Sequence, residues 1–401
     1  MYNKIPATAG PGATHGFARS RTVPTVVMPF LSRVFALIVL AASMSGCASI
    51  PTSEQYENTV AFLGPAGGGG ASRDARGEFR RVFCAVAEEA QSKIETDDDC
   101  QEYLWRLTDE RVSDPIDVLP PLDTALRVFI VGGAFSDCFG DASVAYGKAV
   151  AHLAAGGARI TIVPISGRSS AYLNASRIAE SYAEADPSDG ELVVLIGYSK
   201  GTVDILHFLA RYPATSRTVD AVVSVSGPVH GSEAARRGAW LYDALLANSF
   251  AGMCDPGDGG VVDSLVSEYA QQWLEENELP EYISYYTLSA FTTRQHMARG
   301  LAPAYRMLAR LDPRNDGQVT VEEGLVPGSV LLGYANSDHW GLAIDIEDEL
   351  QFFAARPDER RFPREILIEA ILRFVSDDLG AAAGPTLPFD EASRSNPELT
   401  R

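Results

Sequence analysis

Apolar residues follow two alternating patterns between positions 126 and 334. Six short stretches are rich in consecutive apolar residues, at 126–131, 159–165, 192–196, 221–225, 282–288 and 330–334. Three longer stretches have apolar residues at helical spacing, at 143–155, 169–185 and 202–212. Short apolar runs are typical of strands buried on both faces. The alternation predicts an α/β fold in which right-handed crossovers place helices on both faces of a mostly parallel central sheet.

Other segments do not follow this alternation. Residues 74–120 begin with a helical pattern and are predicted to form an amino-terminal helical appendage to a main domain at 121–379. Residues 231–280 are helical, acidic and interrupted by glycines, and 364–375 is a closing amphipathic helix. Residues 380–401 are rich in Ala, Pro and Ser, which predicts a disordered tail.

The apolar run 192–196 leads into Gly197-Tyr198-Ser199-Lys200-Gly201, a G-x-S-x-G pattern between a predicted strand and a predicted helix. Glycine at both flanks allows a sharp turn, which would place the Ser199 hydroxyl at the carboxyl edge of the sheet. A Gly-Ser turn without chemistry is the alternative. The strand before the motif and the helix after it favour Ser199 as a nucleophile.

This strand, motif and helix resemble the nucleophile elbow of the α/β-hydrolase superfamily. The resemblance implies an α/β-hydrolase fold, with the insertion at about 231–280 forming a helical cap. SGRSS at 166–170 and CDPGD at 254–258, together with Asp204, resemble a group of bacterial members of the superfamily, which implies no substrate. NDGQV at 315–319 and DHW at 338–340 are similar to lipases and polyester depolymerases.

The superfamily places the nucleophile, the acid and the histidine in that order along the chain. His339 follows the strand 330–334 directly, in the position where the family carries its histidine. His296 lies in a polar, basic segment and is predicted to be solvated, whereas His230 could line a pocket. Asp316 precedes His339 in an Asp-Gly turn that could project its carboxylate toward the sheet edge. The predicted catalytic residues are therefore Ser199, Asp316 and His339.

A calcium loop is a competing interpretation of residues 312–323. Asp312, Asp316, Gly317 and Glu323 match positions of an EF-hand loop. Arg314 places a cation where an oxygen ligand belongs, so we expect no metal or other cofactor.

Two backbone N–H groups should form an oxyanion hole for this mechanism. One belongs to Lys200, the residue after the nucleophile, and the other to Ala134 or Phe135 in the loop after the strand 126–131. The side chain of Lys200 is predicted to point to solvent or to pair with an acid.

Residues 1–46 contain four basic residues, no acidic residue and an apolar run at 34–42, which predicts a cleaved signal peptide. Small residues directly before Cys47 resemble a bacterial lipobox, which implies lipidation of Cys47 and a flexible linker over 47–73. The protein would then be an exported lipoprotein in the outer membrane, the periplasm or at the cell surface. An ordinary secretory signal is the alternative, and translation could begin at Met28.

Without the leader the chain has 29 basic and 53 acidic residues, a net charge of −24. This acidity argues against nucleic acid as a partner. Four cysteines remain after Cys47, and an even number in an exported protein predicts two disulfides with three possible pairings. We favour Cys84–Cys100 and Cys138–Cys254, with unpaired buried thiols as the alternative.

These observations predict a lipid-anchored serine hydrolase that cleaves an ester through an acyl-enzyme, in the manner of carboxylesterases and lipases. The substrate would be a small molecule, a lipid or a polyester. A thioesterase, a polyester depolymerase and a non-catalytic binding lipoprotein on the same scaffold remain alternatives. The presence of all three triad residue types in the expected order favours an enzyme.

Overall fold

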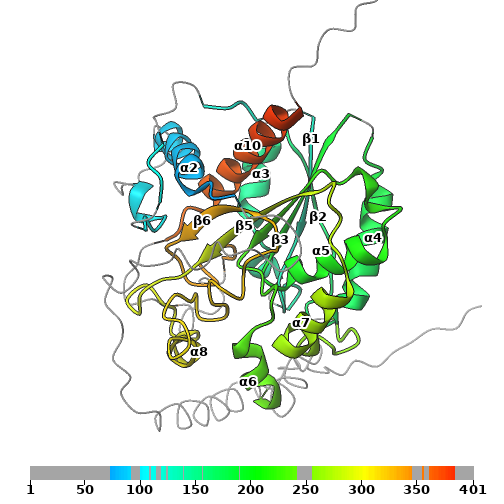
Figure 1. The fold of residues 1–401 in the computed structure, drawn as a ribbon, viewed down its shortest axis with the longest axis vertical. Coiled ribbons are helices and arrows are strands. Elements are labelled where there is room, and N and C mark those ends of the chain that lie inside the picture. The colour runs from blue at the N-terminus through cyan, green and yellow to red at the C-terminus, as the bar shows by residue number, and fades with distance from the viewer. Residues whose placement is uncertain are drawn as a thin grey trace, which may run out of the picture. The chain divides into compact units, whose positions relative to one another are not determined.

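The six predicted strands form one sheet in which every neighbouring pair is parallel (Figure 1). They are β1 Leu126–Val131, β2 Arg159–Ile162, β3 Leu192–Tyr198, β4 Ala221–Val225, β5 Ser284–Ala290 and β6 Val330–Ala335. Their order across the sheet is β2-β1-β3-β4-β5-β6. Strand β3, which carries the nucleophile motif, therefore lies in the interior of the sheet, between β1 and β4.

The computed structural model describes most of the chain after position 72. The described residues are 73–91, 100–107, 110–113, 119–122, 125–138, 140–155, 157–188, 190–241, 255–345, 355 and 361–383. The predicted signal peptide, Cys47, the linker up to residue 72 and Cys254 lie outside them.

Helices cover both faces of the sheet (Figure 1). The described helices are α2 Arg76–Gln91, α3 Gly147–Ala155, α4 Ala171–Ala185, α5 Lys200–Arg211, α6 Glu233–Leu241, α7 Ser267–Glu276, α8 Ala302–Leu308 and α10 Arg364–Ala383. One hydrophobic cluster joins α2, α3 and α10 to one face of the sheet, and a second cluster joins α4 and α5 to the other.

Strand β3 shows why its sequence is apolar at consecutive positions. Val194 and Ile196 belong to the cluster under α2 and α10, whereas Val193 and Leu195 belong to the cluster under α4 and α5. All four side chains are at most 1% exposed. Successive side chains of a strand point to opposite faces, so a strand covered on both faces needs apolar residues at every position.

Several predicted boundaries differ from the structure. Strand β2 ends at Ile162 rather than at residue 165, and it lies at an edge of the sheet, where its side chains are partly exposed. The helix predicted from residue 143 begins at Gly147, after Tyr146 adopts a positive φ of 57°. Helix α8 was not predicted, and α10 continues to Ala383, into the segment predicted as a disordered tail.

The sequence predicted that the amino-terminal helix would be an appendage to the main domain. In the structure, helix α2 is instead part of that domain. Phe79 and Phe83 of α2 are fully buried in the same cluster as α10 and the sheet. The Ala75 N–H donates to the Leu331 carbonyl of β6, at 3.0 Å. The helix was therefore predicted correctly, but its place in the fold was not.

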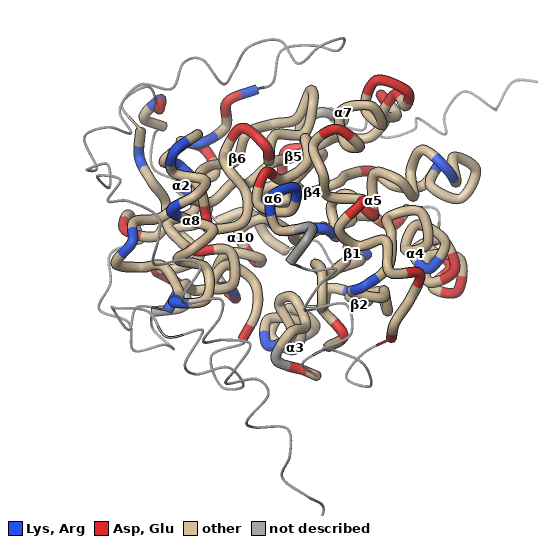
Figure 2. The backbone as a smooth tube through the Cα atoms, turned by 90° about the horizontal axis from the view of Figure 1, so that it is seen from below, with Lys and Arg blue, Asp and Glu red and all other residues tan. Residues whose placement is uncertain are grey.

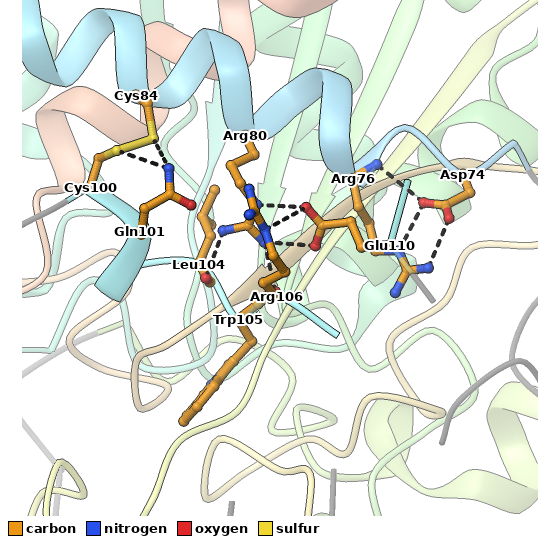
Figure 3. Close-up of polar contacts among 10 residues, drawn as sticks. All are labelled: Asp74, Arg76, Arg80, Cys84, Cys100, Gln101, Leu104, Trp105, Arg106 and Glu110. Atoms are coloured by element: carbon orange, nitrogen blue, oxygen red, sulfur yellow. Dashed lines mark hydrogen bonds and ion pairs between the residues drawn. A yellow bond between two sulfur atoms is a disulfide. The ribbon is translucent and has the colours of Figure 1, made fainter. Parts of the chain in front are cut away.

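A second part of the amino-terminal region runs beside the end of β6. The Trp105 N–H donates to the Tyr334 carbonyl at 2.8 Å, and the Asn336 N–H donates to the Tyr103 carbonyl at 2.9 Å. Arg80 of α2 holds this segment, since it donates to both Glu110 carboxylate oxygens, at 2.6 and 2.7 Å (Figure 3). The Arg80 and Glu110 side chains are 4% and 2% exposed, so this ion pair is buried.

The disulfide predicted between Cys84 and Cys100 is present and joins α2 to the start of this segment (Figure 3). The predicted Cys138–Cys254 bridge involves a residue outside the described part of the chain and stays a prediction. Neighbours of the two cysteines do meet, since the Asp255 N–H donates to the Asp137 carboxylate at 3.3 Å.

The segment predicted as a cap is described only in part. Its helix α7 packs on α5, where the Trp273 ring stacks on His207 with ring centroids 4.3 Å apart. Acidic residues gather around α7 (Figure 2). Residues 242–254 lie outside the described part, so the cap stays a prediction.

Within the described ranges, no helix is long and apolar enough to cross a membrane. Those same ranges contain no group of three or more Asp, Glu, His or Cys side chains arranged to hold a metal ion.

Candidate active site

Ser199 occupies the turn between β3 and α5 with φ 55° and ψ −129°. Positive φ is rare for a residue with a side chain and costs on the order of 1–3 kcal/mol. The turn is held on the β4 side, since the Ser199 N–H donates to the Val225 carbonyl at 3.0 Å. Such strain at a half-buried serine between a strand and a helix is what a nucleophile elbow requires.

The two flanking glycines are required by close contacts with backbone. A Cβ added to Gly197 would lie 2.5 Å from the Thr202 backbone N, and one added to Gly201 would lie 2.2 Å from the Val131 carbonyl oxygen. Real Cβ atoms do not approach other atoms so closely. The glycines therefore allow α5 to begin directly against β3 and β1.

His339 lies between Ser199 and Asp316, although the three residues come from distant parts of the chain. Its Nε2 is 2.8 Å from Ser199 Oγ, and its Nδ1 is 2.7 Å from Asp316 Oδ2. Asp316 is fully buried and His339 is 5% exposed. An ionised carboxylate can only accept, so Nδ1 carries the hydrogen and Nε2 is left to accept the serine proton.

Asp316 is fixed on both of its oxygens. Oδ1 accepts the backbone N–H groups of Gln318 and Val319, at 2.9 and 2.8 Å, while Oδ2 faces His339. The Asp316 carbonyl also accepts the His339 N–H at 2.9 Å. The predicted Asp-Gly turn therefore presents a carboxylate to the histidine loop through both side chain and backbone.

Comparisons with known proteins identify the fold family. The structure resembles the crystal structure of the metagenomic carboxyl esterase MGS0156, with 30% sequence identity over 85% of this chain and 99% of that chain, and a TM-score of 0.69. The chain belongs to the α/β-hydrolase superfamily. It also resembles the mature lipase BlEst2 of Bacillus licheniformis, with 21% identity over 60% of this chain and 93% of that chain, and a TM-score of 0.43. No protein-family model and no curated protein matches the chain.

One predicted oxyanion donor of this hydrolase is excluded by the structure. The Phe135 N–H donates to the Gly167 carbonyl at 2.9 Å, so it is not available to a substrate oxygen. Ala134 remains a candidate, next to Gly133. A Cβ on Gly133 would lie 3.3 Å from Ser199 Oγ, which shows how closely this loop approaches the serine. Lys200 is the first residue of α5, where the N–H has no helical acceptor.

Two residues that the sequence did not single out hold the His339 loop of the hydrolase. The fully buried Asp338 accepts the Ala298 N–H on one oxygen and the Gly341 N–H on the other, both at 2.7 Å. The Tyr198 hydroxyl donates to the His339 carbonyl at 2.6 Å. Burial, and to a lesser degree the Asp316 charge, raises the pKa of Tyr198 well above its ordinary value, so Tyr198 stays a donor.

Asp312, Asp316 and Glu323, the acidic residues of the competing calcium loop, each bind different partners within the protein. The Asp312 carboxylate pairs with Arg314 at 3.0 Å. The Glu323 carboxylate accepts the backbone N–H groups of Thr320 and Glu233, each at 2.7 Å. Burial raises the pKa of Glu323. Only Asp316 of this group lies against His339.

The other two histidines considered for this hydrolase lie elsewhere. His230 Nε2 is 2.9 Å from the Leu325 carbonyl, and burial lowers its pKa. His296 is half-buried beside Trp105 and Asn336, in a surface hollow of about 450 Å³. His339, by contrast, contacts both Ser199 and Asp316.

Proposed function

We propose that the protein is a serine-dependent ester hydrolase with Ser199 as nucleophile, His339 as general base and Asp316 as the acid that orients it. The observation that carries the proposal is the continuous hydrogen-bonded chain from Ser199 Oγ through the imidazole to Asp316. A serine hydroxyl is a poor nucleophile at neutral pH and needs such a base. The likeness to a carboxyl esterase supports an ester as the substrate.

In this mechanism the Ser199 oxygen attacks the carbonyl carbon of the ester while its proton passes to His339 Nε2. The tetrahedral intermediate collapses, the bond to the leaving oxygen breaks, and His339 gives the proton to the leaving alcohol. Water then attacks the acyl-enzyme with His339 again as base, and releases the carboxylic acid and free Ser199.

The negative oxygen of each tetrahedral intermediate needs two donors. The Lys200 N–H and the Ala134 N–H are the proposed pair, since the Phe135 N–H is already used. One such donor is typically worth about 3–4 kcal/mol of activation free energy. The Ser199 turn supports this assignment because the Lys200 N–H directly follows the serine at the start of α5.

The test is the kinetic effect of Ser199→Ala, His339→Ala and the double variant on p-nitrophenyl esters of graded acyl length. Each single variant should lose roughly 10⁴-fold or more in kcat, and the double variant little more, because triad residues act as a unit. Ser216→Ala and His152→Ala are matched controls, one buried serine and one exposed histidine, and should keep activity. Wild-type turnover in Ser199→Ala would leave a binding protein on this scaffold as the better account.

Parallel assays separate an oxygen ester from the alternative substrates. Acyl thioesters of the same acyl groups and a solid aliphatic polyester should be cleaved more slowly than the best soluble oxygen ester. Preference for either one would keep the mechanism and change the substrate class.

The proposed location is the cell envelope, with Cys47 as a lipidated mature amino terminus. The Cys84–Cys100 disulfide supports an oxidising compartment, because disulfides persist mainly in exported proteins. The Cys47→Ser variant should appear as unprocessed or soluble protein in cell fractionation, while the wild type partitions into membranes. Equal membrane association of both would contradict the lipid anchor.

A further inference from the structure

Helix α5, which begins directly after Ser199, lies beside helix α4 (Figure 1). Buried polar side chains connect the two helices. Lys200 and Asp204 form an ion pair one turn apart on α5, and both side chains are fully buried. Asn174 of α4 is also fully buried, and its Nδ2 donates to Asp204 Oδ2 at 2.8 Å. Asp204 Oδ1 therefore binds Lys200, the residue after the nucleophile, and Asp204 Oδ2 binds Asn174 of α4.

Asn174 in turn holds the loop after β2. Its Oδ1 accepts the Ser166 N–H at 3.1 Å, and its Nδ2 donates to the Ser166 carbonyl at 3.0 Å. The amide thus bonds both backbone groups of one residue, as a neighbouring strand would. Ser166 is fully buried, so without Asn174 its N–H would lose this acceptor, while its carbonyl would keep the Ser169 N–H at 3.2 Å.

The next residue, Gly167, attaches this loop to the proposed oxyanion loop. The Gly167 carbonyl accepts the Phe135 N–H, and the Gly167 N–H donates to Asp137 Oδ1, each at 2.9 Å. A Cβ on Gly167 would lie 2.5 Å from the Phe135 N, so the two backbones are in direct contact. Phe135 adopts a positive φ of 62° in this position, which the contact with Gly167 holds in place.

The two proposed oxyanion donors therefore belong to segments that are joined through the protein interior. Lys200 lies at one end of the chain Lys200–Asp204–Asn174–Ser166, and Ala134 lies next to Phe135 at the other end. Burying an ion pair has a large desolvation cost, so the Lys200–Asp204 pair is weak evidence for stability.

From these contacts we infer that Asn174 is a positioning residue that sets the distance between the two oxyanion donors. The inference rests on the proposed function, because it assigns the Lys200 and Ala134 N–H groups to the oxyanion. Asn174 touches neither the substrate nor Ser199 in this account. It acts through Asp204 on one donor segment and through Ser166 and Gly167 on the other.

The experiment compares Asn174→Leu, which keeps the shape of the side chain and removes all three hydrogen bonds, with the wild-type enzyme. We expect kcat per titrated active site to fall about 10- to 100-fold, part of the effect of deleting one donor. KM should stay within about twofold, because the oxyanion contact forms mainly in the transition state. The rate of inactivation by a phosphonate, which needs the same donors, should fall in parallel.

Thr287→Val is the matched control. Thr287 is a fully buried residue of β5 whose hydroxyl bonds Ser329 Oγ at 2.8 Å and the Val326 N–H at 3.2 Å. The Thr287→Val variant should have a lower melting temperature than the wild type and the same kcat per titrated active site. If Asn174→Leu does not fold, Asn174→Ser replaces it, since its hydroxyl keeps one group that can donate to Asp204 or accept the Ser166 N–H, and it should show a smaller loss in kcat.

The outcomes separate this inference from the proposed function. Wild-type kcat in a folded Asn174 variant, with Ser199→Ala inactive, would overturn the inference alone. A change in melting temperature with unchanged kcat would make Asn174 a purely structural residue and would also overturn it. Activity that survives Ser199→Ala would instead overturn the proposed function.

Discussion

Two buried ion pairs outside the triad, Arg80–Glu110 and Lys200–Asp204, differ in their surroundings. Arg80–Glu110 joins α2 to the segment beside β6, and Arg80 also donates to the carbonyls of Leu104 and Trp105 at 2.8 and 2.9 Å (Figure 3). Lys200–Asp204 lies within a single helix, directly after the nucleophile. The first pair closes a long stretch of chain onto the sheet, whereas the second adds little to a helix that is already formed. We therefore expect the first pair to affect stability alone and the second to affect catalysis as well.

The charged contact at the active site itself gives the largest expected effect. Asp316→Asn should lower kcat by roughly 10³- to 10⁴-fold, because an amide in place of the carboxylate favours the wrong imidazole tautomer. The measurement is steady-state kinetics on the best soluble ester. Asp312→Asn and Glu323→Gln, which alter carboxylates outside the triad, should keep kcat within about tenfold. Loss of activity in all three variants, with sensitivity to a chelator that calcium reverses, would instead favour a metal loop.

Removing the cation of each ion pair tests the comparison directly. Arg80→Met and Lys200→Met each leave a carboxylate buried without its partner, which should lower the free energy of unfolding by about 3–5 kcal/mol. Urea denaturation gives this value for both variants. Only Lys200→Met should also lower kcat in the protein that remains folded. Equal effects of the two variants on kcat would remove the distinction between the pairs.

The disulfide beside Arg80 should act on stability alone. It closes a loop between residues separated by 16 positions, and loops of this length are stabilised by about 3 kcal/mol. The double variant Cys84→Ser with Cys100→Ser should therefore unfold at lower urea concentration with unchanged kcat. A fall in kcat would show that the amino-terminal segment also positions the His339 loop, which follows the end of β6.

A smaller effect, on the pH dependence of stability, is expected from His207. This residue lies on α5 and stacks on Trp273. Burial, and secondarily the Lys200 ammonium, lowers the pKa of His207 from 6.5 to about 4. Below pH 6.5 the unfolded chain then binds a proton that the folded protein does not, so stability falls as the pH drops toward 4. Between pH 7 and pH 5 this loss amounts to roughly 2 kcal/mol. His207→Phe, which can still stack on Trp273, should show a flatter dependence of the unfolding free energy on pH.

The sequence predicted most of the sheet because buried strands differ from other segments in composition. It also predicted Ser199, Asp316 and His339 in contact, since their order along the chain and their positions after strands define where they meet. The packing of α2 could not be predicted, because an amphipathic pattern shows which face is apolar but not what covers it. The use of the Phe135 N–H by Gly167 depends on a contact between distant residues that leaves no local pattern.

The burial of the Lys200 side chain likewise could not be predicted from the local sequence. The spacing of four residues between Lys200 and Asp204 is visible in the sequence and is typical of an exposed helical ion pair. The complete burial of both side chains depends on α4, whose Asn174 provides the remaining hydrogen bond. The sequence left open whether Lys200 points to solvent or pairs with an acid, and the tertiary structure shows a buried pair with Asp204.

The central claim is that Ser199 is a nucleophile, and covalent labelling tests it most directly. The purified protein would be treated with a fluorophosphonate probe, digested and mapped by mass spectrometry, alongside Ser199→Ala and His339→Ala. The account predicts a single adduct on the peptide containing Ser199, none in Ser199→Ala and strongly slowed labelling in His339→Ala. An unlabelled wild-type protein that still hydrolyses esters, or an adduct at another residue, would contradict the account.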